Sequence, residues 1–247
     1  MSVARAAELL SRARHGVALT GAGVSAESGI PTFRGEGGLW TKYDPVKVSS
    51  IDSFMADPES YWRVSRERGS VALAAKPNPG HEALAVLEAS GHLVAIVTQN
   101  TDGLHRDAGS KRVIELHGSG RRVRCLDCGA FESRRDVQDR LGVEMPPRCQ
   151  TCGGGLLKPT VVLFGEPMPV EAVTEAYELA AQADVMLVVG TSLAVYPAAD
   201  IPLAAVRSGA AMIVVNAEST PFDRFAEVVI HGRSGEVLPE IVSLIGE

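Results

Sequence analysis

The sequence predicts an α/β fold in which a doubly wound parallel sheet carries a smaller second domain. Short apolar runs rich in β-branched residues recur at 15–20, 93–98, 185–189, 212–215 and 227–230. They are continuous rather than alternating, as expected for strands that are buried on both faces of a parallel sheet. Between them, at 80–90, 170–183 and 198–208, alanine and leucine recur at helical spacing. Strands that alternate with helices in this way are typical of a doubly wound sheet.

The composition of the chain limits the classes of protein to which it can belong. With 247 residues, 45% of them apolar, the chain can bury a sizeable core. Its first residues begin an amphipathic helix rather than an export signal, and no apolar stretch is long enough to cross a membrane. The net charge of -6 argues against non-specific binding of nucleic acid. With cysteines spaced for a metal, these features lead us to expect a cytoplasmic protein.

The first expected strand, 15–20, runs into the turn Gly21-Ala22-Gly23-Val24-Ser25-Ala26. This G-x-G-x-x-A pattern can open a helix whose amides point at a phosphate, which makes it a candidate dinucleotide site. Glycines are equally needed in any tight strand-to-helix turn, so the spacing leaves both interpretations open. The acidic residue that usually ends the second strand of such a site is not evident, which makes a hydride-transferring enzyme less favoured.

Two stretches interrupt the alternation of strands and helices. One is 36–78, which contains the aromatic residues Trp40, Tyr43, Phe54, Tyr61 and Trp62, and the other is 121–156, which contains all the cysteines. We predict that these stretches form the smaller domain, and that 1–35, 79–120 and 157–247 form the larger one. A ligand is then expected at the carboxyl ends of the strands, in a crevice that faces the smaller domain.

Polar residues follow several of the expected strands. Strand 93–98 ends in Thr98-Gln99-Asn100-Thr101-Asp102, whose amide and carboxylate groups suit ribose hydroxyls and a carboxamide. A hydrogen-bonded turn is the alternative, because Asn and Asp also favour turns. The strand ends at Gly190-Thr191-Ser192 and Asn216-Ala217-Glu218 are also small or polar and can hold an adenosine, with ordinary loops as the alternative.

Among the six histidines, His117 is the candidate general base, because it follows the strand-like Glu115-Leu116. A single histidine is more often structural than catalytic, and His105 is the main rival for the role. His81 lies in Pro77-Asn78-Pro79-Gly80-His81, where we expect it to cap or pack the beginning of a helix.

The only cysteines form two pairs, Cys125-x-x-Cys128 and Cys149-x-x-Cys152. A spacer of about twenty residues lets both pairs close around one zinc ion, and two disulfides are the less favoured alternative. Four thiolates leave no open position on the metal, so the zinc is expected to be structural. Beside this segment lies a basic cluster, Lys111-Arg112 with Arg121-Arg122-Val123-Arg124, which we interpret as a solvated face, with an acidic partner as the alternative.

Taken in order, the motifs resemble those of the sirtuins, the NAD-dependent protein lysine deacylases, of the bacterial and archaeal type. The resemblance rests on Gly21-Ala22-Gly23-Val24-Ser25 with Gly29-Ile30-Pro31-Thr32-Phe33-Arg34, Thr98 to Asp102, Leu116-His117-Gly118, the cysteine pairs, Phe164-Gly165-Glu166, Gly190-Thr191-Ser192 and Val215-Asn216. It implies a Rossmann-like large domain and a small domain made of a helical module and a zinc module. It also implies NAD as co-substrate and one structural zinc ion.

The resemblance further implies a role for individual residues. His117 would be the general base, and Asn100 would order the ribose and a water. NAD would be bound by Gly21, Ala22, Gly23, Ser25, Phe33, Arg34, Gln99, Asn100, Asp102, Gly190, Thr191, Ser192, Asn216, Glu218 and Ser234. An acyl-lysine peptide would enter between two loops, which contain Val162, Phe164, Gly165 and Glu166 on one side and Val195 and Tyr196 on the other.

The expected activity is deacetylation of lysine in proteins or peptides, with release of nicotinamide and O-acyl-ADP-ribose. Desuccinylating sirtuins carry a Tyr-x-x-Arg pair, whereas this chain has Ser65-x-x-Arg68 in one register and Trp62-x-x-Ser65 in the other, so desuccinylation is at most a weaker expectation. The alternatives are a protein ADP-ribosyltransferase or an NAD hydrolase in the same pocket, or a non-catalytic NAD-sensing module. No membrane partner is expected, and nucleic acid only through an acylated DNA-binding substrate.

Overall fold

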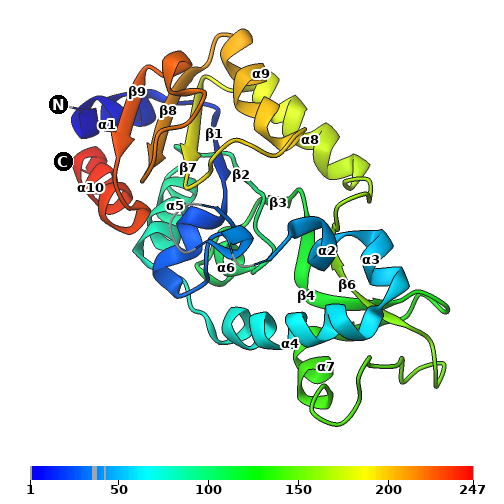
Figure 1. Ribbon diagram of the computed structural model, residues 1–247. Helices are drawn as coiled ribbons and strands as arrows, with labels where there is room; N and C mark the ends of the chain where they lie inside the picture. Colours follow the sequence, from blue (N-terminus) through cyan, green and yellow to red (C-terminus); the bar gives the residue numbers. More distant parts are fainter. Residues whose placement is uncertain (1, 35–37, 42, 247) are drawn as a thin grey trace.

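The computed structural model describes residues 2–34, 38–41 and 43–246, which fold into two parts of unequal size (Figure 1). The larger part contains a six-stranded sheet in the order β3-β2-β1-β7-β8-β9, and every pair of neighbouring strands is parallel. Its strands are β1 (Gly16–Thr20), β2 (Ala95–Thr98), β3 (Val113–Glu115), β7 (Val185–Val189), β8 (Ala211–Asn216) and β9 (Val228–His231). The predicted doubly wound parallel sheet is therefore confirmed.

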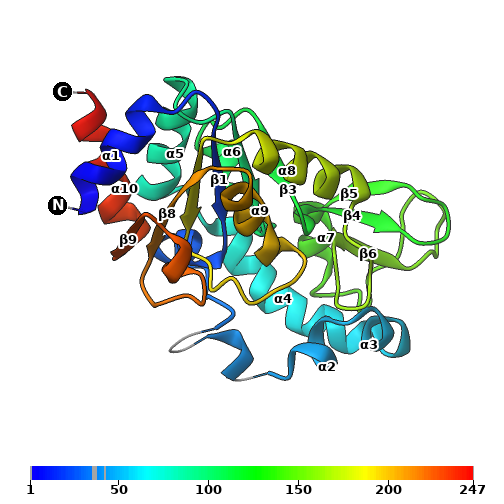
Figure 2. The ribbon, with the colours of Figure 1, turned by 90° about the horizontal axis from the view of Figure 1, so that it is seen from above.

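Helices cover both faces of this sheet, which explains why its strands are apolar throughout. One face packs against α1 (Ser2–Arg12), α5 (Pro79–Ala89) and α10 (Ser234–Gly246), and the other against α8 (Val170–Gln182) and α9 (Ile201–Arg207). Figures 1 and 2 show α1 and α10 side by side, with both chain ends near them. The short α6 (Leu104–Asp107) follows β2.

The five predicted strands are present, each within two residues of its expected limits. The helix expected at 198–208 is divided into η3 (Ala198–Asp200), a 3-10 turn, and α9, because Pro202 suits the first turn of a new helix and lacks an N–H. The strand β3 was not among the predicted strands. It has three residues and lies at the edge of the sheet, where burial leaves little pattern in the sequence.

The smaller part contains a three-stranded antiparallel sheet in the order β5-β4-β6. Its elements are β4 (Gly118–Cys125), β5 (Phe131–Ser133), β6 (Leu157–Val161), α7 (Arg134–Arg140) and the helices α2 (Pro45–Ser49), α3 (Ile51–Ala56) and α4 (Pro58–Ala74), with the 3-10 turn η2 (Leu39–Thr41) before them. Trp62 of α4 is fully buried against Val123 and Leu157, and its Nε1 donates to the Leu157 carbonyl at 3.1 Å. The two interrupting stretches thus share one core.

The predicted limits of the two domains stay a prediction. The three-stranded sheet extends beyond 121–156 on both sides, since β4 begins at Gly118 and β6 ends at Val161. The limit between residues 35 and 36 lies outside the described residues.

The order of the strands reverses between β1 and β7, because β2 and β3 follow on one side of β1 whereas β8 and β9 follow on the other side of β7. The connections that follow β1 and β7 lead to helices on opposite faces of the sheet, and open α/β sheets bind ligands at the carboxyl ends of the strands where this reversal occurs. In the described part of the chain, no helix combines the length and the apolar composition needed to cross a membrane.

Candidate active site

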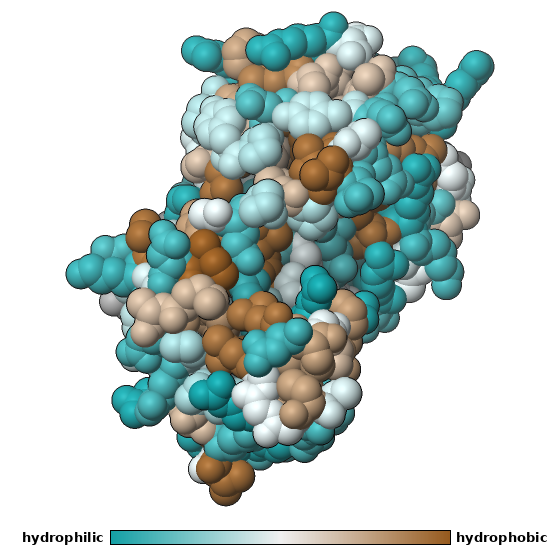
Figure 3. All heavy atoms as spheres, turned by 90° about the vertical axis from the view of Figure 1, so that its right-hand side faces the viewer, coloured by the Kyte–Doolittle hydropathy of each residue, from teal (hydrophilic) through white to brown (hydrophobic). Residues whose placement is uncertain are grey.

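A cleft of about 1440 Å³ lies at the carboxyl ends of β1, β2, β7 and β8, between the sheet and the smaller part of the molecule. Figure 3 shows the side of the molecule on which apolar and polar side chains surround the indentation between the two parts. Each residue that we expected at the NAD and peptide sites lines this cleft, and so does His117. The fold thus brings together side chains that are up to about two hundred positions apart in the sequence.

The turn after β1 is the 3-10 helix η1 (Ala22–Ser28), and its glycines serve close packing. A Cβ atom on Gly23 would lie 2.7 Å from the Cα of Gly190, and one on Gly21 would lie 2.7 Å from the Cβ of Thr191. The N–H of Gly23 donates to the Gly190 carbonyl at 2.8 Å, and that of Gly21 to the Val189 carbonyl at 3.1 Å. These two amides are consequently not free for a phosphate, and the glycines instead let the β1 and β7 loops touch.

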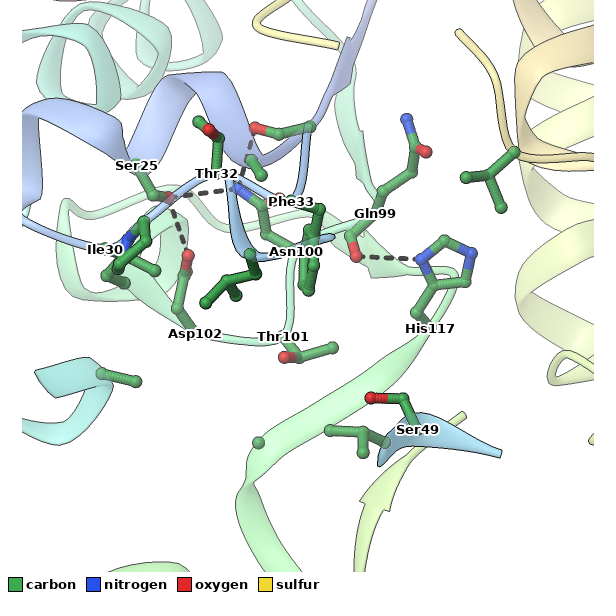
Figure 4. Close-up of a pocket in the computed structure, with 18 of the residues that line it drawn as sticks. Ser25, Ile30, Thr32, Phe33, Ser49, Gln99, Asn100, Thr101, Asp102 and His117 are labelled. Atoms are coloured by element: carbon green, nitrogen blue, oxygen red, sulfur yellow. Dashed lines mark hydrogen bonds between the residues drawn. The ribbon is translucent and has the colours of Figure 1, made fainter. Parts of the chain in front are cut away.

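Ser25 is the centre of a buried polar network (Figure 4). Its hydroxyl donates to Asp102 Oδ2 at 2.7 Å and accepts from Asn100 Nδ2 at 3.1 Å. The Asn78 N–H donates to Nδ1 of His81, so the His81 Nε2–H is the donor to Ser25 Oγ at 3.3 Å. The network fixes the Asn100 amide and the Asp102 carboxylate, which follow β2, in one orientation. His81 also completes the capping box of α5, as we predicted.

His117 lies between β3 and β4 and lines the cleft, where its Nδ1 points to the Gln99 carbonyl (Figure 4). Its Nδ1 is 3.0 Å from the carbonyl oxygen of Gln99, and since a carbonyl only accepts, Nδ1 carries the proton and Nε2 is free to accept one. Burial lowers the pKa of His117 below its ordinary value, partly offset by this hydrogen bond. Gly118 follows at φ +70°, where a side chain would overlap the Thr160 carbonyl.

The rival histidine, His105, does not line the cleft. It is buried beneath the sheet end, and its Nε2 is 2.8 Å from Thr20 Oγ1. Burial lowers the pKa of His105 to about 3. The neutral, enclosed imidazole of His105 therefore has a structural role through its hydrogen bond with Thr20 at the end of β1, and it is not placed to act as the base.

The far end of the cleft is built by the ends of β7 and β8 and by the beginning of α10. Thr191 Oγ1 accepts from Gln99 Nε2 at 3.0 Å, which ties this end to the His117 end. Asn216 Nδ2 donates to the Glu218 carbonyl at 2.6 Å. Glu27 was missed from the sequence: its carboxylate accepts the Gly235 N–H at 2.8 Å and lines the cleft beside Ser234.

Segment 162–166 lines the cleft, and so do Val195 and Tyr196. The Phe164 N–H donates to the Ser49 carbonyl at 2.8 Å, and its carbonyl accepts from the Ile51 N–H at 2.9 Å. These contacts fasten the segment to the helices α2 and α3. The aromatic residue Trp40, singled out in the sequence only as one of a group, stacks on Phe33 with ring centroids 5.2 Å apart and lies 6.4 Å from Phe164.

The four cysteines gather at one point, with sulfur atoms within 4.8 Å of one another. Cys125 and Cys152 have their Sγ atoms 3.8 Å apart, and so do Cys128 and Cys149. A tetrahedron with Zn–S bonds of about 2.3 Å has edges of about 3.8 Å, so this arrangement fits zinc. It does not fit disulfides, whose S–S bonds are about 2 Å long.

Comparison with known proteins agrees with this site. The Sir2 family model matches residues 21–197. The chain is 52% identical over 241 residues to an NAD-dependent protein deacylase 2 of Archaeoglobus fulgidus, covering 97% of this chain and 94% of that protein. It is 46% identical over 236 residues to an NAD-dependent protein deacetylase 1 of Pyrobaculum aerophilum, covering 96% and 92%.

Solved structures show the same likeness. A Sir2 enzyme that is 49% identical superposes with a TM-score of 0.92 over 99% of this chain and 98% of its own. A complex of Sir2 with a p53 peptide and NAD+ superposes with a TM-score of 0.90 at 40% identity, over 98% of both chains. A family model that spans most of the chain, and relatives this similar along nearly all of it, leave one conclusion: this chain belongs to the Sir2 family.

Proposed function

We propose that this chain is an NAD-dependent protein lysine deacylase, chiefly a deacetylase, that releases nicotinamide and O-acyl-ADP-ribose. The observation that carries the proposal is the placement of His117. Its free Nε2 faces a cleft that is large enough for a dinucleotide and that is also lined by segment 162–166 and by Val195 and Tyr196. A dinucleotide and an acyl-lysine side chain entering from opposite ends would meet beside this imidazole.

The residues of the chain have separate tasks in this proposal. Asp102 and Asn100, held by Ser25, bind and orient the nicotinamide end, and Gln99 and Thr191 hold the ribose between the two ends. Gly21, Ala22, Gly23, Phe33 and Arg34 enclose the diphosphate region, and Gly190, Ser192, Asn216, Glu218 and Ser234 enclose the adenosine end. Bound NAD supplies the ribose carbon that receives the acyl oxygen as nicotinamide leaves. His117 accepts at Nε2 the proton of a ribose hydroxyl.

The acyl-lysine peptide lies as an extended strand between Val162, Phe164, Gly165 and Glu166 on one side and Val195 and Tyr196 on the other, in the manner of strand addition. We also propose the division into a large domain, 1–35, 79–120 and 157–247, and a small domain, 36–78 and 121–156. The four cysteines hold one structural zinc ion, and metal-bound thiols suit a cytoplasmic location.

Removal of succinyl groups is a weaker second activity in this proposal. Arg68 lines the cleft, with its guanidinium carbon 5.6 Å from the centre of the Phe33 ring. Within the described residues no carboxylate lies at ion-pair distance from it, so an acidic acyl group could take that place. Ser65 occupies the position of the tyrosine in one register, and its hydroxyl accepts from Arg134 at 3.3 Å. A succinyl group would therefore gain only the contact with Arg68, so this arrangement favours acetyl over succinyl.

The test is incubation with NAD and matched acetyl-lysine and succinyl-lysine peptides, with peptide mass and nicotinamide both followed. We expect peptide-dependent nicotinamide release with loss of the acyl mass, abolished by His117→Ala but not by His15→Ala, which removes an exposed imidazole. Arg68→Met is expected to reduce desuccinylation more than deacetylation. Nicotinamide release without loss of acyl mass would instead indicate ADP-ribosyl transfer or NAD hydrolysis, and NAD binding without release a sensor.

A further inference from the structure

The basic cluster of the sequence is divided by the fold. Arg112 pairs with Glu175 of α8 at 2.8 Å, and Arg121 pairs with Asp107 of α6. Lys111 lies just before β3 in the larger part of the molecule. Arg122 and Arg124 differ from Arg112 and Arg121, because no ion pair or side-chain hydrogen bond of either residue occurs within the described ranges. The structure therefore leaves two arginines of the cluster without an acidic partner in this part of the chain.

The pleat of β4 places both arginines on the outer face of the three-stranded sheet. Val123 and Cys125, which alternate with them, are fully buried in the core of the smaller part, whereas Arg122 and Arg124 are exposed. Arg124 is directly opposite Phe131 of β5. The acidic residue of β5, Glu132, is opposite Val123 and pairs with Arg140. The pleat thus separates the charges, with the carboxylate inside and the guanidiniums outside.

Phe131 organises the two guanidiniums. Its ring is 52% exposed, and the guanidinium carbons of Arg122 and Arg124 lie 4.2 and 5.8 Å from its centre. Arginine stacked on an aromatic face keeps its N–H groups available at the edge, and the stacking limits the side-chain entropy that binding would remove. The exposed ring adds an apolar contact between two cations.

A hollow of about 460 Å³ adjoins this face. The residues that line it include Arg106, Arg121, Arg122, Phe131 and Thr160, together with the acidic residues Asp107 and Glu115. Arg121 lines both this hollow and the main cleft. We name the surface formed by Arg122, Arg124 and Phe131 the arginine face.

We propose that the arginine face docks a short acidic segment of a polypeptide. Residues two apart on β4 are separated by about 6.7 Å, which equals the separation of alternate side chains in an extended peptide, so two carboxylates can each meet one guanidinium fork. A nucleic acid fits less well. Phosphates that extend into the hollow would approach the acidic residues Asp107 and Glu115. Two guanidiniums release few counterions from a nucleic acid, and the net charge of -6 on the chain lowers its affinity for a polyanion further.

The test is fluorescence anisotropy on the zinc-loaded full chain with three labelled probes: a decapeptide in which Glu alternates with Ser, the same peptide with Gln in place of Glu, and a ten-residue oligothymidine. We expect the Glu peptide to bind best. Arg122→Gln with Arg124→Gln is expected to weaken its binding about tenfold, as loss of two charge-assisted contacts implies. Raising the salt concentration is expected to weaken it as well.

The matched control is Lys111→Gln with Arg207→Gln, which removes the same charge from exposed positions of the larger part. This control is expected to change the affinity less than twofold. Zinc content, thermal unfolding and deacylation of a short neutral peptide are expected to be the same in both double variants, since neither touches the main cleft. Equal binding of the Glu and Gln peptides, an equal effect of the two double variants, or tighter binding of the oligothymidine would each overturn the proposal.

Discussion

His117 Nδ1 lies 3.0 Å from the carbonyl oxygen of Gln99, and this one contact decides which nitrogen of the imidazole can accept a proton. The carbonyl holds the proton on Nδ1, so Nε2 faces the cleft without one. Burial keeps the ring neutral by lowering its pKa. The same loop carries Asn100, so the position of the proposed base and the hydrogen bonds of the proposed NAD site are set together.

The pH dependence of deacylation follows from this contact. Because the pKa of His117 is lowered from 6.5, the neutral base persists below that pH, and we expect the acidic limb of kcat/KM to lie below pH 6.5. The measurement is kcat/KM for an acetyl-lysine peptide between pH 5 and 8. An acidic limb above pH 6.5 would contradict a buried, neutral imidazole.

The zinc site is expected to support the smaller part of the molecule only. We expect one zinc ion per chain, bound by Cys125, Cys128, Cys149 and Cys152. After chelation, hydrogen exchange is expected to rise throughout β4, β5 and β6, while β1, β2 and β7 stay protected, because their core is separate. Equal loss of protection in both sheets would show that the zinc stabilises the whole fold.

Gly23→Ala tests the close approach of the β1 and β7 loops. The new Cβ would lie 2.7 Å from the Cα of Gly190, so one loop must move. We expect a loss of about 1–3 kcal/mol in the free energy of unfolding and a higher KM for NAD. Gly142→Ala is the control, since a Cβ there meets no atom within 4 Å. A similar result for both variants would remove the packing role of Gly23.

Lys158→Met tests how segment 162–166, which we propose contacts the peptide, is held. The buried Lys158 ammonium lies 2.8 Å from Glu166 and donates to the Val161 carbonyl at 2.9 Å, which closes the turn from β6 into segment 162–166. Removing the ammonium takes the cation away from the Glu166 carboxylate, which keeps only the Leu163 N–H among its partners in the described ranges, so we expect the KM for the peptide to rise about tenfold or more, with little change in the KM for NAD. Lys158→Arg is expected to keep most of the affinity. An unchanged peptide KM would refute this role.

Acid is expected to destabilise the fold through His105. Its folded pKa of about 3 lies below the unfolded value of 6.5, so the unfolded chain binds the additional proton between these limits. Stability is fully present above pH 6.5 and falls by about 2 kcal/mol between pH 6.5 and 5. Urea unfolding at several pH values measures the slope, which His105→Gln is expected to reduce but His15→Gln is not. Some slope is expected to remain, because burial also lowers the pKa of the neighbouring His81.

The sequence identified many of the elements that enclose the site. Continuous apolar runs specified five strands of the parallel sheet, because burial on both faces excludes polar residues. It did not identify the three strands of the smaller sheet, which are short or half-exposed and have a mixed composition. Glu27 and Lys158 were also missed, since their partners are 208 and 8 residues away and no local pattern connects them.

The sequence by itself determined the class of fold, the metal-binding cysteines and the motifs at the strand ends, because each depends on local spacing or on a continuous apolar run. Only the tertiary structure decided which histidine reaches the cleft. His105 and His117 have similar local contexts, but the first is enclosed beneath β1, whereas the second is half-buried and lines the cleft just before the turn at Gly118. It also decided that Gly21 and Gly23 serve loop packing and that Arg122 and Arg124 stay unpaired. Those outcomes depend on contacts between segments far apart in the chain, which no local pattern contains.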